Sequence, residues 1–329
     1  KKSIVLLEFN TALFSKLLLN LKNYNGNIIL VNQRRSAIWN KKAIDAVKQS
    51  NSKILNYDKF LSKDEKLRVP ILVEEYSKKL DNFWKNSELF ETLFQIENIS
   101  FWNVIKDIII KSYNEKLHSF ILSILATKSL FLNMDIQCIV SLSESGETEK
   151  TFLEYNKNKI PFILLEHGFH ENNVEPFVFH HEEYRNFSDK TAVWGNLKKK
   201  YLIDQFNMEP SRIIVSGSPR HDDYFESITE TKKTNEITVL LAPNPITEYS
   251  GFVNTELELK FEETIRQIFS ILKQFRNINP IVKLHASQLP HNIKIKSLIN
   301  KIDSTIPIIQ SFSIIEAIND SDIVIVITP

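Results

Sequence analysis

An ionisable pair followed by glycine stands where a predicted buried strand ends. The apolar run Phe162–Leu165 leads directly into Glu166, His167 and Gly168. Imidazole titrates near neutral pH, so His167 could accept a proton from a hydroxyl group that attacks a substrate. A carboxylate could do the same, and the residue types leave Glu166 and His167 as alternative general bases. The structural alternative is a strand end whose polar side chains are satisfied by hydrogen bonds.

A second group of residues suits an anion. The predicted strand Arg212–Val215 continues into a turn that contains Gly217, Ser218 and Arg220. Backbone N–H groups in such a turn, with the amino end of a following helix, suit a phosphate. The Arg220 guanidinium could add a bidentate contact to phosphate or carboxylate. No Gly-Lys-Ser/Thr follows, so the turn is not a Walker loop. The structural alternative is a turn in which Arg220 pairs with a nearby aspartate.

Weaker signals lie at other predicted strand ends. His285 follows one apolar run, and Pro243 and Asn244 begin a proline-stiffened loop through which backbone groups could hold a nucleotide base. The segment Ser143–Glu149 follows another run and has the Ser and Glu residues of a helix N-terminal cap. We interpret it as a cap, and its Gly146 as a helix-entry turn.

The sequence does not predict a metal site or another cofactor. There is no His-Glu-x-x-His pattern, and Cys138 is the only cysteine. Asp320–Asp322 precedes a predicted strand instead of following one, which is the wrong end for a ligand, so we interpret it as a solvated turn. A single thiol inside an apolar run is typical of a buried structural cysteine and favours a reducing compartment.

Ten short apolar runs could position these groups. They are near-continuous hydrophobic stretches, which is typical of parallel strands covered on both faces. Helical patterns lie between them, and this alternation predicts βαβ units with ligands at the carboxyl ends of the strands. The predicted strands are Ser3–Leu7, Asn27–Val31, Gln137–Leu142, Phe162–Leu165, Thr191–Val193, Arg212–Val215, Ile237–Ala242, Ile281–Leu284, Pro307–Gln310 and Ile323–Thr328.

The helical patterns differ along the chain. Lys260–Phe275 has apolar residues at helical spacing, whereas Glu147–Asn158 and Asn196–Phe206 are shorter connecting helices. Residues 63–132 are rich in aromatic and aliphatic side chains and contain no convincing strand. We predict a helical insertion there, with a partner-binding or membrane-surface element as the alternative.

Length and composition limit the possible classes of protein. A chain of 329 residues favours two domains, and we place the boundary near Phe187–Lys190. With 43% hydrophobic residues, 25% charged residues and a net charge of +1, the chain is ordinary for a globular protein and gives no reason to expect nucleic acid as a partner. No apolar run is long enough to cross a membrane. We expect a cytoplasmic location, either free or peripheral on the inner face of the membrane.

Taken in order, several of these pieces carry a family resemblance. They are a His-Gly after a strand, a Gly-Ser-Pro-Arg-His-Asp stretch, a Leu-Ala-Pro strand end, a Lys-Leu-His strand end and a last apolar strand. Over residues 137–329 the set resembles bacterial surface-polysaccharide transferases of the GT-B fold, above all the CDP-glycerol glycerophosphotransferase family. The pieces stand at His167-Gly168, Gly217–Asp222, Leu241–Pro243, Lys283–His285 and Asp322–Ile325.

The resemblance implies an α/β fold of two Rossmann-like domains with parallel sheets and the active site between them. Residues 1–188, with the insertion, would hold a glycan or lipid-linked acceptor, and residues 189–329 a CDP- or CMP-linked donor. The implied activity is metal-independent transfer in cell-surface polysaccharide synthesis, with contact to the inner membrane. His167 would be the general base, His285 would steady the donor phosphate, and the Gly217–Arg220 turn would lie beside the donor.

The sequence departs from the family pattern at two points. His285 is followed by Ala286 where the family has proline, and the family's Ser-Ser motif would begin at or after Pro329, so we expect an incomplete C-terminal domain. Glu166 is also similar to the carboxylate base of bacterial sialyltransferases and Kdo transferases. Two other functions stay open. One is an isomerase similar to UDP-GlcNAc 2-epimerase, which would need several carboxylates, and the other is a non-catalytic nucleotide- or carbohydrate-binding subunit.

Overall fold

The computed structural model divides the chain into two compact units, which are described separately below. The first unit is Lys1–Arg220 and the second is His221–Pro329. The residues that the structure describes are 1–56, 59–156, 160–168, 188–222, 224, 235–243, 255–284, 289–310 and 314–327.

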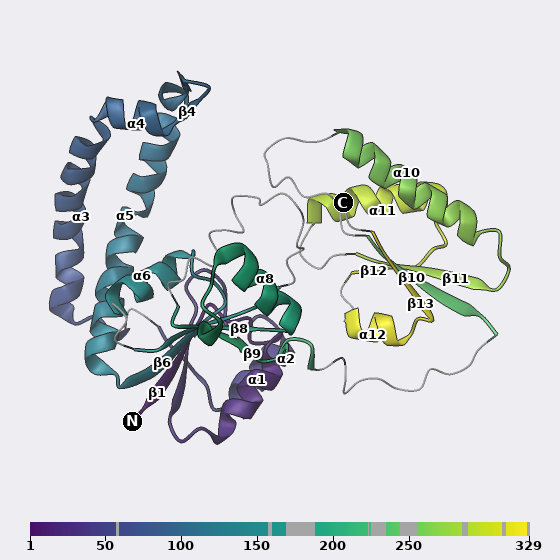
Figure 1. Ribbon diagram of the computed structural model, residues 1–329, viewed down its shortest axis with the longest axis horizontal. Helices are drawn as coiled ribbons and strands as arrows, with labels where there is room; N and C mark the ends of the chain where they lie inside the picture. The colour runs from purple at the N-terminus through teal and green to yellow at the C-terminus, as the bar shows by residue number, and fades with distance from the viewer. Residues whose placement is uncertain are drawn as a thin grey trace. The chain divides into compact units, whose positions relative to one another are not determined.

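The first unit is built on a seven-stranded sheet in which all the neighbouring strands run parallel (Figure 1). The strand order is β3-β2-β1-β6-β7-β8-β9, so the first strand lies inside the sheet and the chain reverses direction across it. The strands are β1 (Ser3–Leu7), β2 (Asn27–Val31), β3 (Lys53–Ile54), β6 (Ile136–Ser141), β7 (Phe162–Leu165), β8 (Lys190–Val193) and β9 (Ile213–Val215).

Helices cover both faces of this sheet, which explains why its strands are apolar throughout. Val5 and Leu7 of β1 pack into one core with Phe152, whereas Leu6 packs into the opposite core with Leu18. The alternation follows from the two-residue period of a strand. The first core contains residues of α5 (Trp102–Asn133) and α6 (Glu147–Asn156), and the second contains residues of α1 (Ser15–Asn20) and α2 (Lys41–Gln49).

The predicted insertion is confirmed as a helical arm. Figure 1 shows α3 (Lys63–Trp84) and α5 as a long pair that extends away from the sheet, with α4 (Ser87–Leu93) at the far end. The arm begins with a capping box, in which the Glu65 N–H donates to Ser62 Oγ and the Ser62 N–H donates to the Glu65 carboxylate. Rings such as Phe90 and Trp102, whose centroids lie 4.5 Å apart, join its helices.

The arm also contains a feature that the sequence did not predict. A short hairpin of β4 (Gln95–Ile96) and β5 (Ile99–Ser100) joins α4 to α5. Despite the apolar character of the arm, no helix among the described residues combines the length and apolarity needed to cross a membrane.

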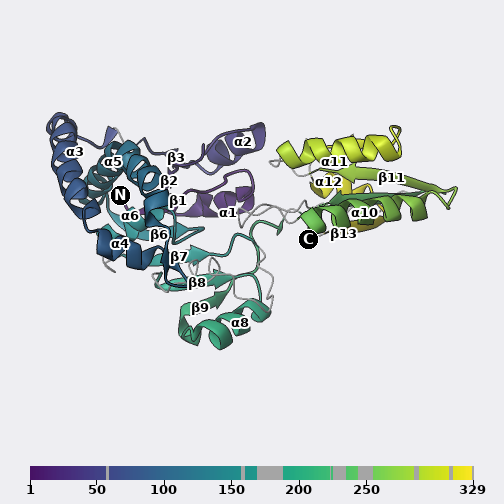
Figure 2. The same ribbon diagram turned by 90° about the horizontal axis from the view of Figure 1, so that it is seen from above.

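The second unit has a parallel sheet of its own, which Figure 2 shows with the labels β11 and β13. Its four strands lie in the order β12-β11-β10-β13. Ile265 and Phe269 of α10 are buried in its core, which confirms the helical face predicted for this segment. The elements are β10 (Ile237–Pro243), α10 (Thr255–Leu272), β11 (Ile278–Lys283), α11 (Leu289–Ile302), β12 (Ile308–Ile309), α12 (Ile314–Asn319) and β13 (Ile323–Ile327).

The observed division corrects the boundary predicted near residues 187–190. Strands β8 and β9, which we had assigned to 189–329, belong to the first sheet, where Leu165 pairs with Ala192 and Val193 pairs with Val215. The helix between them, α8 (Asn196–Phe206), packs Leu202 against the same sheet. A short apolar run shows that a strand is buried on both faces, but it does not show which sheet the strand joins.

Candidate functional site

Three loops lie side by side at the carboxyl edge of the first sheet. The Glu166 N–H donates to Ala192 O at 2.9 Å, and the Ser216 N–H donates to Val193 O at 2.9 Å. These bonds continue the strand ladders past the ends of β7, β8 and β9. The Glu166–Gly168 segment, Trp194 and the turn after Val215 are therefore neighbours, at the edge where open parallel sheets bind ligands.

Glu166 is held as an anchor for the next loop. Its side chain is 4% exposed, and its carboxylate accepts a hydrogen bond from the Trp194 N–H at 2.6 Å. Its main-chain carbonyl accepts a second bond, from the Trp194 indole at 3.0 Å. These two bonds hold the Glu166 side chain and main chain against the loop after β8. This geometry suits a residue that positions the loop more than one that exchanges protons with a substrate.

His167 and Arg220 come together at the same edge. One Arg220 guanidinium nitrogen, Nη1, donates to the His167 carbonyl at 2.8 Å, and both residues are half-buried. The structure thus joins two groups that the sequence analysis had placed in different domains. Arg220 is still able to offer its other N–H groups, because a guanidinium carries five.

Gly217 has the backbone that a close approach to a ligand requires. Its φ is +74°, in the left-handed region where other residues are strained. Apart from its two chain neighbours, no described residue has an atom within 4 Å of the position where a Cβ would stand. The turn is therefore set by backbone conformation and faces open space on that side. Ser218, which follows it, is half-buried.

The sites predicted on the second unit are only partly described. His285 and Asn244 lie outside the described residues, whereas Pro243 is the last residue of β10 and pairs with Ile327. Sequence analysis included Lys283 in the Lys-Leu-His strand end but gave it no role of its own. The residue is 7% exposed, and its ammonium group donates to Leu284 O and Gln310 O, each at 2.9 Å. Burial lowers the pKa of this ammonium group. A lysine inside an apolar strand was the available signal.

A second set of buried carboxylates was also missed. Glu8 directly follows β1, is 1% exposed and accepts bonds from the Gln33 N–H at 2.7 Å and from Thr148 Oγ1 at 2.8 Å. Glu149 of α6 is fully buried and pairs with Arg34 at 2.5 Å, and burial raises the pKa of its carboxyl group. Glu8 ends an apolar run just as Glu166 does, so its position was a readable signal. The Arg34–Glu149 pair spans distant segments and left no local signal.

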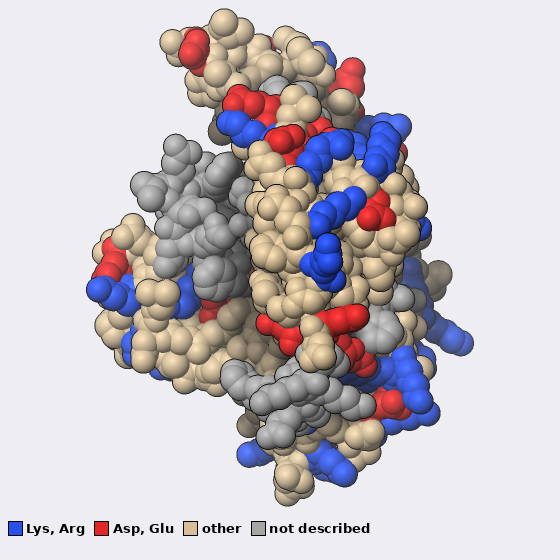
Figure 3. Space-filling model, turned by 90° about the vertical axis from the view of Figure 1, so that its right-hand side faces the viewer, with Lys and Arg blue, Asp and Glu red and all other residues tan. Residues whose placement is uncertain are grey.

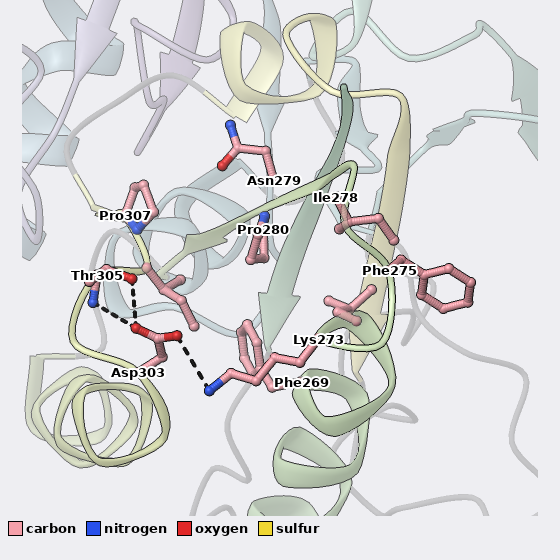
Figure 4. A pocket seen from close by; sticks show the side chains of 11 residues that line it. Phe269, Lys273, Phe275, Ile278, Asn279, Pro280, Asp303, Thr305 and Pro307 are labelled. Carbon is pink, nitrogen blue, oxygen red and sulfur yellow. Dashed lines mark hydrogen bonds and ion pairs between the residues drawn. The ribbon is translucent and has the colours of Figure 1, made fainter. Parts of the chain in front are cut away.

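A pocket of about 210 Å³ lies at the amino edge of the second sheet, where its strands begin (Figure 4). Its polar side is an ion pair between Lys273 and Asp303 at 3.3 Å, and Asp303 also accepts from Thr305 Oγ1 at 2.6 Å. Ligands of parallel sheets bind at the carboxyl ends, and none of the predicted site residues lines this pocket. We therefore assign these contacts to stability.

In the Asp303→Asn variant, the free energy of unfolding should fall less steeply than in the wild type as the pH is lowered. Hydrogen bonds from Thr305, aided by Lys273, hold the pKa of the Asp303 carboxyl group below its ordinary value of 3.8. Such a group stabilises the fold above its unfolded pKa, and that contribution is lost as the pH falls through the folded value. Urea midpoints measured from about pH 5 to about pH 2.5 test this. The matched control is Asp107→Asn on α5, in which the urea midpoint should depend on pH as in the wild type. If the midpoint of Asp303→Asn also falls in acid as the wild-type midpoint does, the assignment is wrong.

The surface charge shows both signs close together. Figure 3 shows basic and acidic side chains of the described residues as neighbours over one face of the molecule. Exposed i,i+4 pairs such as Lys260–Glu256, at 2.7 Å, are part of this pattern on α10.

Comparisons with known proteins agree with this fold and leave the family open. No family model matches the chain. An uncharacterised protein of Methanocaldococcus jannaschii, MJ1060, is 23% identical over 203 residues, which is 54% of this chain and 36% of that protein. The chain thus spans only about a third of that relative's length.

Solved structures share the arrangement of elements at low identity. The chain is similar to UDP-GlcNAc 2-epimerase from Neisseria meningitidis bound to UDP-GlcNAc, with a TM-score of 0.53 and 12% identity over 99% of this chain and 77% of the other. For the M. jannaschii UDP-GlcNAc 2-epimerase the TM-score is 0.50 and the sequence identity is 13%, over 99% of this chain and 78% of the other. For the wall teichoic acid polymerase TagF the TM-score is 0.42 and the sequence identity is 11%, over 98% of this chain and 65% of the other. This TM-score is too low to support a closer relationship. The likenesses to the two epimerases confirm the predicted GT-B-like α/β fold and its parallel sheets.

Proposed function

We propose that this protein is a transferase that uses a nucleotide-activated donor, with His167 as general base, in the synthesis of a cell-surface polysaccharide. One observation carries the proposal: Arg220 donates to the His167 carbonyl at 2.8 Å, so a proton acceptor and a fixed cation stand together at the carboxyl edge. A UDP-GlcNAc 2-epimerase of similar fold was solved with its nucleotide sugar bound, which supports a nucleotide-activated donor.

The chemistry follows from the residue types at this edge. The hydroxyl group of a glycan or lipid-linked acceptor would lose its proton to the His167 imidazole as its oxygen attacks the donor. The nucleotide would leave with the bonding electrons, and the charge on its phosphate would be stabilised by Arg220 and by N–H groups of the Gly217–Ser218 turn. The predicted role of His285 in holding the donor phosphate belongs to the same proposal. No metal is required in this scheme.

The structure favours His167 over Glu166 as the base. The Glu166 carboxylate is buried and already accepts from the Trp194 N–H, whereas His167 is half-buried at the loop itself. A base must reach the proton that it removes. We therefore assign Glu166 to positioning the loop after β8.

An isomerase similar to UDP-GlcNAc 2-epimerase is the second candidate. The carboxylates that this reading needs are present, since Glu8, Glu144 and Glu149 are buried near the carboxyl edge. Glu8 and Glu144 already accept bonds from main-chain N–H groups, of Gln33 and of Ser188, each at 2.7 Å. These bonds favour structural roles, which is why we rank isomerisation second.

Incubation with labelled CDP-, CMP- and UDP-linked donors separates the candidates. Donors are first selected by thermal shift with CMP, CDP, UDP and GDP, because a ligand that binds only the folded state raises its melting temperature. Transfer to an added glycan, or donor hydrolysis that Arg220→Ala slows, supports the proposal. A product whose sugar is epimerised at one carbon and still linked to the nucleotide establishes the isomerase. Binding without turnover establishes a binding subunit.

A further inference from the structure

A cavity of about 500 Å³ lies in the first unit, apart from the His167 loop. It is bounded by the loop after β2, one side of α5 and the first turn of α6, and α6 lies against α5 (Figure 1). The sheet order places β1 between β2 and β6, so the chain turns back across β1 at this point. Ligands of open α/β sheets bind at such a switch point, and the volume is in the range of small-molecule sites.

The lining of the cavity combines three kinds of group. Arg34 and Lys150 supply positive charge, Gln33 and Ser123 supply hydrogen-bonding groups, and Phe120 supplies an aromatic ring. Guanidinium groups bind carboxylates and phosphates in bidentate geometry. Amides and hydroxyls bind sugar hydroxyls, while aromatic rings pack on apolar surface. The set therefore fits a small molecule that carries many hydroxyl groups and one anionic group.

The Arg34 guanidinium is held in place by a buried carboxylate, that of Glu149. Its Nη2 pairs with Glu149 at 2.5 Å, and Glu149 is fully buried under the N-terminal turn of α6. A Cβ at Gly146 would overlap both the Glu149 carboxylate and the Arg34 guanidinium, so the glycine makes room for this pair. The predicted helix-entry turn at Gly146 thus has a second role. Arg34 keeps 36% of its side chain exposed, and it lines the cavity.

The local charges leave room for an added anion. Glu8 is satisfied by the N–H groups of Gln33 and Arg34 and by Thr148, and Glu147 on the rim pairs with Lys116 at 3.2 Å. These carboxylates are already partnered by groups of the protein.

Lys150 is exposed at the rim, and it makes no ion pair with any residue that the structure describes. Together with the exposed part of Arg34 it favours a negative group on the ligand over a positive one.

We propose that this cavity binds an acidic sugar, a hydroxyl-rich ring bearing a carboxylate or a phosphate, through Arg34, Lys150 and the facing side of α5. Under the proposed transferase function this sugar is part of the acceptor, and to that extent the inference rests on that function. The binding itself needs no donor and no turnover. Because α5 belongs to the helical arm, the arm helps to select the ligand.

Calorimetric titration of the whole chain with glucuronate, glucose 6-phosphate, glucose and inorganic phosphate tests the proposal. At least one acidic sugar should bind ten-fold or more tightly than glucose and than phosphate, and the preferred one identifies the anion. Arg34→Gln should weaken binding at least ten-fold, with partial rescue in Arg34→Lys. Ser119→Phe adds bulk from an exposed position on the α5 wall and should block binding without altering the fold.

Matched controls keep the outcome specific. Arg266→Gln removes an exposed arginine on α10 of the second unit and should leave the affinity unchanged. His167→Ala should also bind normally, because His167 does not line the cavity. A wild-type chain that binds the acidic sugar but transfers nothing would contradict the transferase proposal alone. Equal affinity for glucose, affinity for phosphate equal to that for the sugars, no binding of either acidic sugar, or binding unchanged in Arg34→Gln and Ser119→Phe would overturn the cavity assignment.

Discussion

The His167→Ala variant should transfer substrate about 10²–10⁴-fold more slowly than the wild type while keeping its fold, because general base catalysis contributes that much to such reactions. The main chain at this position is anchored by the Glu166 N–H to Ala192 and by Arg220 to the His167 carbonyl, and neither bond uses the imidazole. Removing the ring therefore leaves these loop contacts in place. The measurement is kcat at saturating donor and acceptor, with the melting temperature as a check on folding.

The matched control is His118→Ala. His118 is an exposed histidine on α5, so the same substitution there removes a ring without touching the carboxyl edge. Its rate should stay at the wild-type value. A His167→Ala enzyme with a near-normal rate would show that His167 is not the base.

Glu166→Ala should destabilise the first unit by about 2–3 kcal/mol, because it leaves the partly buried Trp194 N–H without its carboxylate acceptor. The lost bond is the one from the Trp194 N–H, 2.6 Å from the carboxylate of a residue that is 4% exposed. Denaturant unfolding at neutral pH measures the change through the midpoint at an unchanged slope.

Glu166→Gln distinguishes positioning from catalysis. The amide oxygen of glutamine can still accept from the Trp194 N–H, so most of the stability should return. A positioning residue would then allow transfer at a rate near that of the wild type. A stable Glu166→Gln protein that has lost transfer activity would make Glu166 the base and leave His167 as its neighbour.

The strands were readable from the sequence because each is a short, uninterrupted apolar run. Ser3–Leu7, Asn27–Val31 and Phe162–Leu165 have the predicted bounds, and all ten predicted strands are present in the structure. Cys138 was expected to be buried and is half-buried on β6, where burial, aided by Asp189, raises the pKa of its thiol. The strand β3 was not predicted, because its two residues, Lys53 and Ile54, are exposed and form no apolar run.

The site was less readable because it depends on contacts between distant segments. Glu166, His167 and Arg220 were found from their positions at strand ends, but the partnership of Arg220 with His167 required knowing that β9 joins the first sheet. The pair of Arg34 with Glu149 depends on two loops that meet only through the sheet order. Local sequence patterns indicate burial and turns, but they do not indicate which distant segments come into contact.

The position of β1 inside the sheet has a consequence for synthesis on the ribosome. One edge of β1 pairs with β2 soon after both are made, but the other edge waits for β6, since Ser3 lies beside Ile136. At about 5–20 residues per second, that edge stays open for on the order of ten seconds. The helical arm lies in the intervening chain, and local helices form far faster than this. The arm should therefore be folded before the sheet can close, and the open edge of β1 is where a nascent chain is most exposed to mispairing or to chaperones.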